Sequence, residues 1–201
     1  GAAAGAGTVN VSRITGSTGA RISNTRILNG ANADVSVNAG DYSNLSGFVG
    51  SAGLGGTGIG LAADTGIVKR TTTAKLDGII SDSTSTSVAR DVLVKADAKL
   101  GISAVDAGLA VGAGGNAIAG TLATNIMQSN TEAIVNNANL TVKSLSVMAA
   151  HKAKTNIAAG AVSVGVNGLG GSLGVNSVKD TVKAEITGST ITMQSSGAGK
   201  F

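Results

Sequence analysis

The stretch Ala20-Arg-Ile-Ser-Asn24 recurs three more times, in degenerate form, along this chain of 201 residues. Each copy has an apolar residue two places after the alanine and a turn-forming Asn or Gly four places after it. The other copies are Ala74-Lys-Leu-Asp-Gly78, Ala133-Ile-Val-Asn-Asn137 and Ala184-Glu-Ile-Thr-Gly188. Alternating apolar residues followed by a residue that tolerates a left-handed backbone predict a strand that ends in a tight corner.

The alternation also predicts which way the side chains of the four copies point, because neighbouring residues of a strand lie on opposite faces. The residues expected to point into the interior are Ile22, Leu76, Val135 and Ile186. The residues expected to point outward are Arg21, Lys75, Ile134 and Glu185. Ile134 is the one apolar member of the outward set, so we expect it to lie against a covering segment or an assembly surface.

Three further features accompany the copies. A glycine-rich patch precedes each one, at residues 5–7, 55–60, 112–115 and 168–171. An apolar residue that would begin the next strand follows, at Ile27, Ile80, Leu140 and Ile191. A second alternating stretch comes after the first three copies: Val35-Ser-Val37, Val92-Leu-Val94 and Leu145-Ser-Val147. The chain therefore divides into approximate units 1–52, 53–107, 108–161 and 162–201 of a single repeat array.

The alanines that begin the copies are 54, 59 and 51 residues apart, which is typical of an array with loop insertions. A solenoid rung of three short strands and three corners takes about 20 residues, so each unit would supply two to three rungs. The sequence thus predicts an all-β fold, a parallel β-helix (β-solenoid) of about ten rungs. The segment from Ala117 to Val135 can alternatively be written as a short amphipathic helix.

The composition supports a narrow interior. The chain has 31 Gly, no Pro, Cys or Trp, and only Tyr42, Phe48 and Phe201 as aromatic residues. Small and β-branched side chains suit a thin, closely stacked interior. The stretch from Gly101 to Thr124 is interrupted by Asp106 and Asn116, so we do not expect it to be a transmembrane helix. The chain has no Cys and therefore no disulfide framework, which fits long exported proteins. The opening Gly1–Gly7 has no signal-peptide pattern, so we expect an internal segment of a longer protein.

The charges argue against nucleic acid as a partner. The formal net charge is +4, from 15 basic and 11 acidic residues spread along the chain, and Lys69-Arg70 is the only adjacent basic pair. Nucleic-acid binding normally needs a clustered basic face, often with stacking aromatic residues.

No motif in the sequence predicts a catalytic, cofactor-binding or metal-binding site. Gly53-Leu-Gly55-Gly-Thr-Gly58 matches a dinucleotide fingerprint by letter, but that motif needs a strand before it and a helix after it. The tail Gly197-Ala-Gly-Lys200 lacks the remaining residues of a phosphate loop. His151 is the only histidine and is predicted to lie on the surface, without a carboxylate nearby to orient it. We therefore assign no catalytic, cofactor-binding or metal-binding residue and no cofactor, and we do not expect an enzyme.

The repeated pattern resembles the haemagglutinin and leukotoxin-like large exoproteins of the two-partner secretion pathway. The residues that carry the resemblance are Gly5-Ala-Gly-Thr-Val-Asn-Val11, Ala20-Arg-Ile-Ser-Asn24, Gly171-Ser-Leu-Gly-Val-Asn-Ser-Val178 and Ala184-Glu-Ile-Thr-Gly-Ser-Thr-Ile191. The resemblance implies a right-handed parallel β-helix, export through an outer-membrane secretion partner, and a secreted or cell-surface location. It also implies that this stretch is the shaft of an adhesive fibre or cytotoxic exoprotein.

Three functions stay open at this point. The first is a structural or adhesive, non-catalytic segment of a bacterial surface fibre, whose partners would be continuing rungs of the same polypeptide and a host-cell or neighbouring-cell surface. The second is a carbohydrate-active β-helix enzyme. The third is a subunit of a self-assembling extracellular filament, in which copies of the chain pair end to end.

Overall fold

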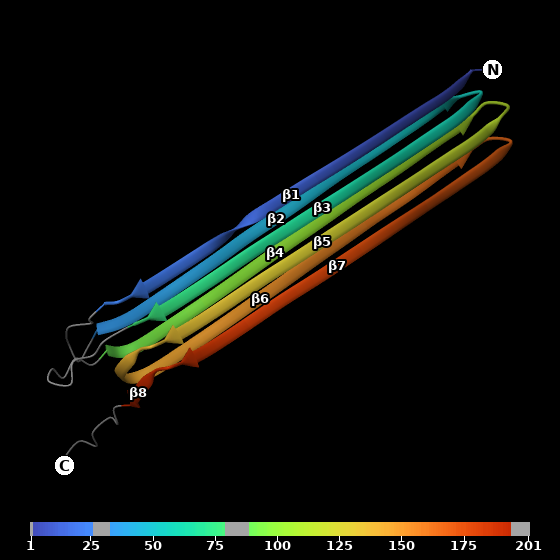
Figure 1. The fold of residues 1–201 in the computed structure, drawn as a ribbon. Helices are drawn as coiled ribbons and strands as arrows, with labels where there is room; N and C mark the ends of the chain where they lie inside the picture. Colours follow the sequence, from blue (N-terminus) through green and yellow to red (C-terminus); the bar gives the residue numbers. More distant parts are fainter. Residues whose placement is uncertain (1, 26–32, 79–88, 194–201) are drawn as a thin grey trace, which may run out of the picture.

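The computed structural model describes residues 2–25, 33–78 and 89–193, and every element within these ranges is a strand. Seven strands of 21 to 26 residues are followed by one of four residues. In chain order they are β1 (Ala3–Ser23), β2 (Ala33–Gly55), β3 (Thr57–Asp77), β4 (Ala89–Gly112), β5 (Asn116–Asn136), β6 (Asn139–Val164), β7 (Asn167–Thr187) and β8 (Thr190–Met193). Figure 1 shows them as long rods lying side by side.

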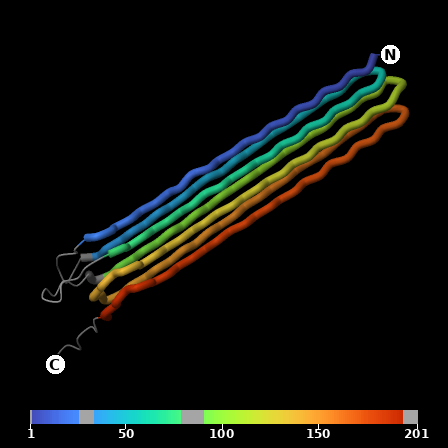
Figure 2. The backbone as a smooth tube through the Cα atoms, in the orientation of Figure 1, coloured from blue at the N-terminus to red at the C-terminus, as the bar shows by residue number. Residues whose placement is uncertain are grey.

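Successive strands alternate between two parallel sheets. Sheet A has the order β1-β3-β5-β7, and sheet B has the order β2-β4-β6-β8. The chain thus runs along sheet A, turns, returns along sheet B and begins the next coil, as the backbone tube in Figure 2 shows. The predicted all-β parallel solenoid is confirmed.

The predicted rung of about 20 residues, and with it the count of about ten rungs, is wrong. Each coil consists of two long strands and two corners, because Ala3 of β1 pairs with Thr57 of β3, 54 residues later. The described residues form three such coils and part of a fourth. The error arose from assuming short strands with three corners in each rung. Gly5 and Gly7 of the first glycine-rich patch lie within the continuous strand β1, and Gly47 lies within β2.

The four sequence copies are register partners. Ala20 pairs with Ala74, Ala74 with Ala133, and Ala133 with Ala184. The spacing of 54, 59 and 51 residues is therefore the length of one coil measured in sheet A. The second alternating stretches also align, since Val35 pairs with Val92 and Val92 with Leu145.

The turn-forming residue of each copy does make a corner. The backbone is left-handed at all four positions, with φ of 50° at Asn24, 62° at Gly78, 48° at Asn137 and 57° at Gly188. The backbone N–H of Asn24 donates to the carbonyl of Asp77 at 3.0 Å, so the corner is bonded to the coil above it. Asn and Gly tolerate this conformation far better than β-branched residues, which explains their presence at these four corners.

The main core lies next to these corners. Leu76 and Val135 are fully buried, as predicted, and Ile22 packs against the same cluster. Ile186 is 49% exposed although it has the same register position, because the last coil has only the short β8 in sheet B among the described residues. The predicted outward residues are exposed or half-buried, and Ile134 lies between Lys75 and Glu185 in its row.

The remaining sequence alternatives are settled by the strand assignments. The possible helix from Ala117 to Val135 is instead the body of β5. Leu140 and Ile191 are register partners, whereas Ile27 and Ile80 lie outside the described residues. Within the described ranges, no helix has the length and apolar character needed to span a membrane.

Candidate functional site

His151 lies inside the solenoid, so the prediction of a surface histidine is wrong. Its side chain is 3% exposed, and its Nδ1 is 3.1 Å from Oδ2 of Asp180, which reaches it from β7. Its Nε2 has no hydrogen-bond partner within the described part of the chain. The pair therefore has an orienting carboxylate but no nucleophile on the other ring nitrogen, which hydrolysis by a Ser–His–Asp arrangement would need.

A polar layer crosses the interior at the level of His151. Asp41, Ala98 and His151 form one row of sheet B. The guanidinium of Arg70, from the facing sheet, donates from Nε to Asp41 at 2.6 Å and from Nη2 to Thr18 at 3.1 Å. Charges of opposite sign thus pair between the sheets, as buried ionic groups require.

A second interior cluster brings two carboxylates together. Asp64 and Asp106 are each 2% exposed. Asn10 donates to Asp64 at 2.7 Å, whereas both carboxylate oxygens of Asp106 have no partner among the described residues. Burial, and then the nearby charge of Asp64, raise the pKa of Asp106 above its ordinary value of 3.8. Because both carboxylates are enclosed, this pair is not accessible to a polysaccharide substrate.

The outer face of sheet B carries a hollow of about 410 Å³ that is lined by cationic and aromatic side chains. Tyr42, Lys99 and Lys152 are register partners on β2, β4 and β6. The next outward row is Asn44, Gly101 and Lys154. We call these six residues the lysine hollow. The side chain of Asn44 lies over Gly101, where a Cβ would be 2.5 Å from Oδ1 of Asn44.

Tyr42 holds Lys99 in place within the lysine hollow. The Lys99 Nζ donates to the Tyr42 hydroxyl at 2.5 Å and lies 4.9 Å from the ring centroid. This hydrogen bond raises the pKa of Lys99, so the ammonium stays charged. With Lys152 beside it and Lys154 one row further on, three ammonium groups surround a concave surface. Such a surface suits an anionic ligand.

Sequence reasoning missed the lysine hollow because its cations are far apart in the chain. Lys99 and Lys152 are 53 residues apart, yet they lie on adjacent strands in register. The alignment of Val92-Leu-Val94 with Leu145-Ser-Val147 contained the signal, because the same offset of 53 residues carries Lys99 onto Lys152.

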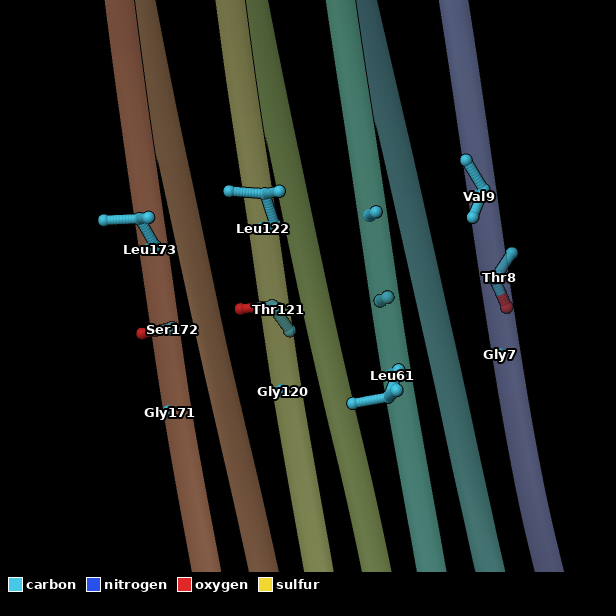
Figure 3. A pocket seen from close by; sticks show the side chains of 12 residues that line it. Gly7, Thr8, Val9, Leu61, Gly120, Thr121, Leu122, Gly171, Ser172 and Leu173 are labelled. Carbon is cyan, nitrogen blue, oxygen red and sulfur yellow. The ribbon is translucent and has the colours of Figure 1, made fainter.

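The outer face of sheet A carries a second, apolar hollow of about 630 Å³ near the glycine-rich corners (Figure 3). Two outward rows of register partners line it. The first, which we call the glycine row, is Gly7, Leu61, Gly120 and Gly171. The second, which we call the leucine row, is Val9, Ala63, Leu122 and Leu173. Inward-pointing residues such as Thr8 and Thr121 separate the two rows.

The dinucleotide-like stretch from Gly53 to Gly58 is the corner between β2 and β3. No helix follows it, because β3 begins at Thr57. A Cβ at Gly53 would come within 2.0 Å of the Ile59 carbonyl oxygen, so this glycine permits the close approach of two strands. Among the described residues, no group of three or more His, Cys, Asp or Glu side chains is placed to hold a metal ion.

Neither the protein-family models nor the curated proteins or solved structures contain a match to this chain. The resemblance to large exoproteins therefore rests on the sequence pattern alone.

Proposed function

We propose that this chain is a non-catalytic shaft segment of a secreted fibre at the bacterial surface. The observation that supports the proposal is the register. Long parallel strands stack coil on coil without a bulge over β1, β3, β5 and β7. Such an array transmits load along its axis through continuous ladders of backbone hydrogen bonds, and it lengthens simply by adding coils.

Exposed apolar residues of the last coil also support the proposal. Apolar residues such as Val182 and Ile186 have the same register as interior residues of earlier coils, yet both are 49% exposed. A further strand of sheet B opposite β7 would bury them. Added coils would therefore extend the same core, with a gain of about 25 cal/mol for each Å² of apolar surface removed from water.

An antibody raised against residues 1–201 tests this proposal in the source bacterium. We expect it to detect a polypeptide of much greater mass than the 19.3 kDa of these residues. This polypeptide should be degraded when intact cells are treated with protease. We also expect surface exposure to be lost when the outer-membrane secretion partner is deleted. A product confined to the cytosol would contradict the proposal.

The lysine hollow favours an adhesive role in addition to the structural one. Three ammonium groups beside a Tyr ring and an Asn amide provide charge, a stacking surface and hydrogen bonds, which together suit an acidic polysaccharide. The described lining residues include no carboxylate, which a glycoside hydrolase needs in pairs. Adhesion therefore fits this surface better than sugar cleavage does.

Retention on immobilised dextran sulfate, with neutral dextran as the matched matrix, tests the adhesive role. We expect retention on the sulfated matrix only. The double variant Lys152→Gln and Lys154→Gln should lose it, whereas Lys179→Gln, on the outer face of sheet A, should keep it. Equal retention of all three proteins would show that general charge, and not the hollow, is responsible. Stronger binding to single-stranded DNA than to dextran sulfate would also contradict a glycan site.

A further inference from the structure

The apolar half of the outer face of sheet A has a pattern that fits a copy of itself. On β1 the glycine row has Gly7 and the leucine row has Val9. On β7 the two rows have Gly171 and Leu173. On β3 the order of large and small is reversed, with Leu61 in the glycine row and Ala63 in the leucine row. In each strand, therefore, one row has a large side chain where the other has a small one.

A two-fold axis between the rows, parallel to them, brings these opposites together. Such an axis runs along the stacking direction of the coils and places each strand of one copy against the same strand of the other, with its direction reversed. Leu173 of one copy then faces Gly171 of the other. On β1, Val9 meets Gly7 in the same way. On β3, Leu61 meets Ala63. Each contact occurs twice, as an isologous interface requires.

The hollows that would receive these side chains are open at the two outermost strands. A Cβ added at Gly7 or at Gly171 would meet nothing within 4 Å. At Gly120 the side chain of Leu61 already leans over the backbone, 3.1 Å from such a Cβ. The best-fitting contacts are therefore those of Val9 and Leu173, which are 77% and 58% exposed in the single chain.

This half of the face also has the apolar character and the size of an interface. The outward rows from Gly5 to Val11 on β1, and their partners on β3, β5 and β7, contain no charged residue. The charged residues begin at Arg13 and continue toward the other end of the strands. Four rows on four strands cover about 27 Å by 19 Å, or about 500 Å² on each copy. The total of about 1,000 Å² reaches the lower limit for a specific protein interface.

A membrane surface suits this face less well than a second copy does. A lipid surface offers no side chains that match the alternation of large and small residues between the glycine row and the leucine row. A second copy matches this alternation on each strand.

We propose that two solenoids pair side by side through the glycine and leucine rows of sheet A, with a two-fold axis parallel to the stacking direction. The pairing goes beyond a single shaft, because it makes two shafts run alongside each other in the same direction. It does not depend on the surface location proposed above, so its failure would leave that proposal standing.

Sedimentation velocity of the chain over a range of concentrations tests the pairing. We expect a monomer–dimer equilibrium. The variant Gly171→Leu adds apolar surface but fills the hollow that receives Leu173, so the dissociation constant should rise about tenfold or more. The exchange variant Gly171→Leu with Leu173→Gly keeps one leucine opposite one glycine, so it should restore pairing. Non-specific hydrophobic association predicts the reverse, with Gly171→Leu pairing more tightly than the wild type.

Two charge variants locate the interface. Leu122→Lys should abolish pairing, whereas Thr73→Lys, which lies on the same face in its charged half, should not. Circular dichroism should show the same β-sheet spectrum for every variant. A wild-type chain that stays monomeric at all concentrations would overturn the proposal. So would pairing that survives Leu122→Lys, or a monomer that binds neutral phosphatidylcholine vesicles through Leu122.

Discussion

The variant Leu76→Ala should destabilise the protein far more than Ile186→Ala, although both residues have the same register position in their coils. Leu76 is fully buried between neighbouring coils and the facing sheet. Its truncation removes a whole buried side chain and leaves a cavity, at a cost of about 3–5 kcal/mol. Ile186 is 49% exposed, so its truncation loses about half of the burial term and encloses no cavity. The expected cost is about 1 kcal/mol.

Urea unfolding followed by circular dichroism measures both costs in the chain of residues 1–201. We expect the midpoint of Leu76→Ala to fall well below that of Ile186→Ala, with similar slopes. Equal losses would refute the reasoning, because they would mean that the last coil is as well covered as the second. A loss of less than about 1 kcal/mol for Leu76→Ala would show that this row does not form the core.

Three further outcomes follow from the interior and the corners. Burial raises the pKa of Asp106 in the folded state. The protonated carboxyl therefore contributes its full stabilisation below about pH 3.8, the ordinary pKa, and this stabilisation is lost as the pH rises through the folded pKa. Urea unfolding of Asp106→Asn should therefore match wild type in acid and show greater stability at neutral pH. Asn137→Val should cost about 1–2 kcal/mol in the same assay, because a β-branched residue is strained at φ of 48°, whereas Asn137→Gly should be nearly neutral, as Gly78 occupies the same corner. Arg21→Asp should keep the β-sheet spectrum but lower the thermal midpoint slightly, because Arg21 pairs with Asp77 at 2.6 Å.

The sequence was sufficient to predict the all-β parallel array, the corner that ends each copy and the alignment of the copies. The period of two and the corner residues are local signals, so Ala20 and Ala74 could be aligned without knowing any contact. Strand length was not predictable in the same way. A glycine within a strand and a glycine at a corner look alike in sequence, and only the sign of φ separates Gly47 from Gly78.

The buried His151–Asp180 pair and the lysine hollow depend on contacts between strands that lie far apart in the sequence. His151 meets Asp180 because β6 and β7 face each other across the interior. Lys99 and Lys152 meet because their strands are adjacent in sheet B. Lysines that are far apart in the sequence therefore lie close together in the folded chain. The offset of one coil is enough to align the two lysines, whereas the contact across the interior also depends on where the chain turns between β6 and β7.

Disulfide formation between engineered cysteines tests the coil length most directly, because the chain has no native Cys. Thr71 and Asn130 are outward register partners on β3 and β5, at a Cα spacing of about 4.8 Å. The pair Thr71→Cys with Asn130→Cys should therefore oxidise readily. The offset pair Thr71→Cys with Gln128→Cys, about 8 Å apart, should not. A coil of two long strands would be contradicted if the first pair stayed reduced while Thr71→Cys bonded to Asp91→Cys, as a rung of about 20 residues would require.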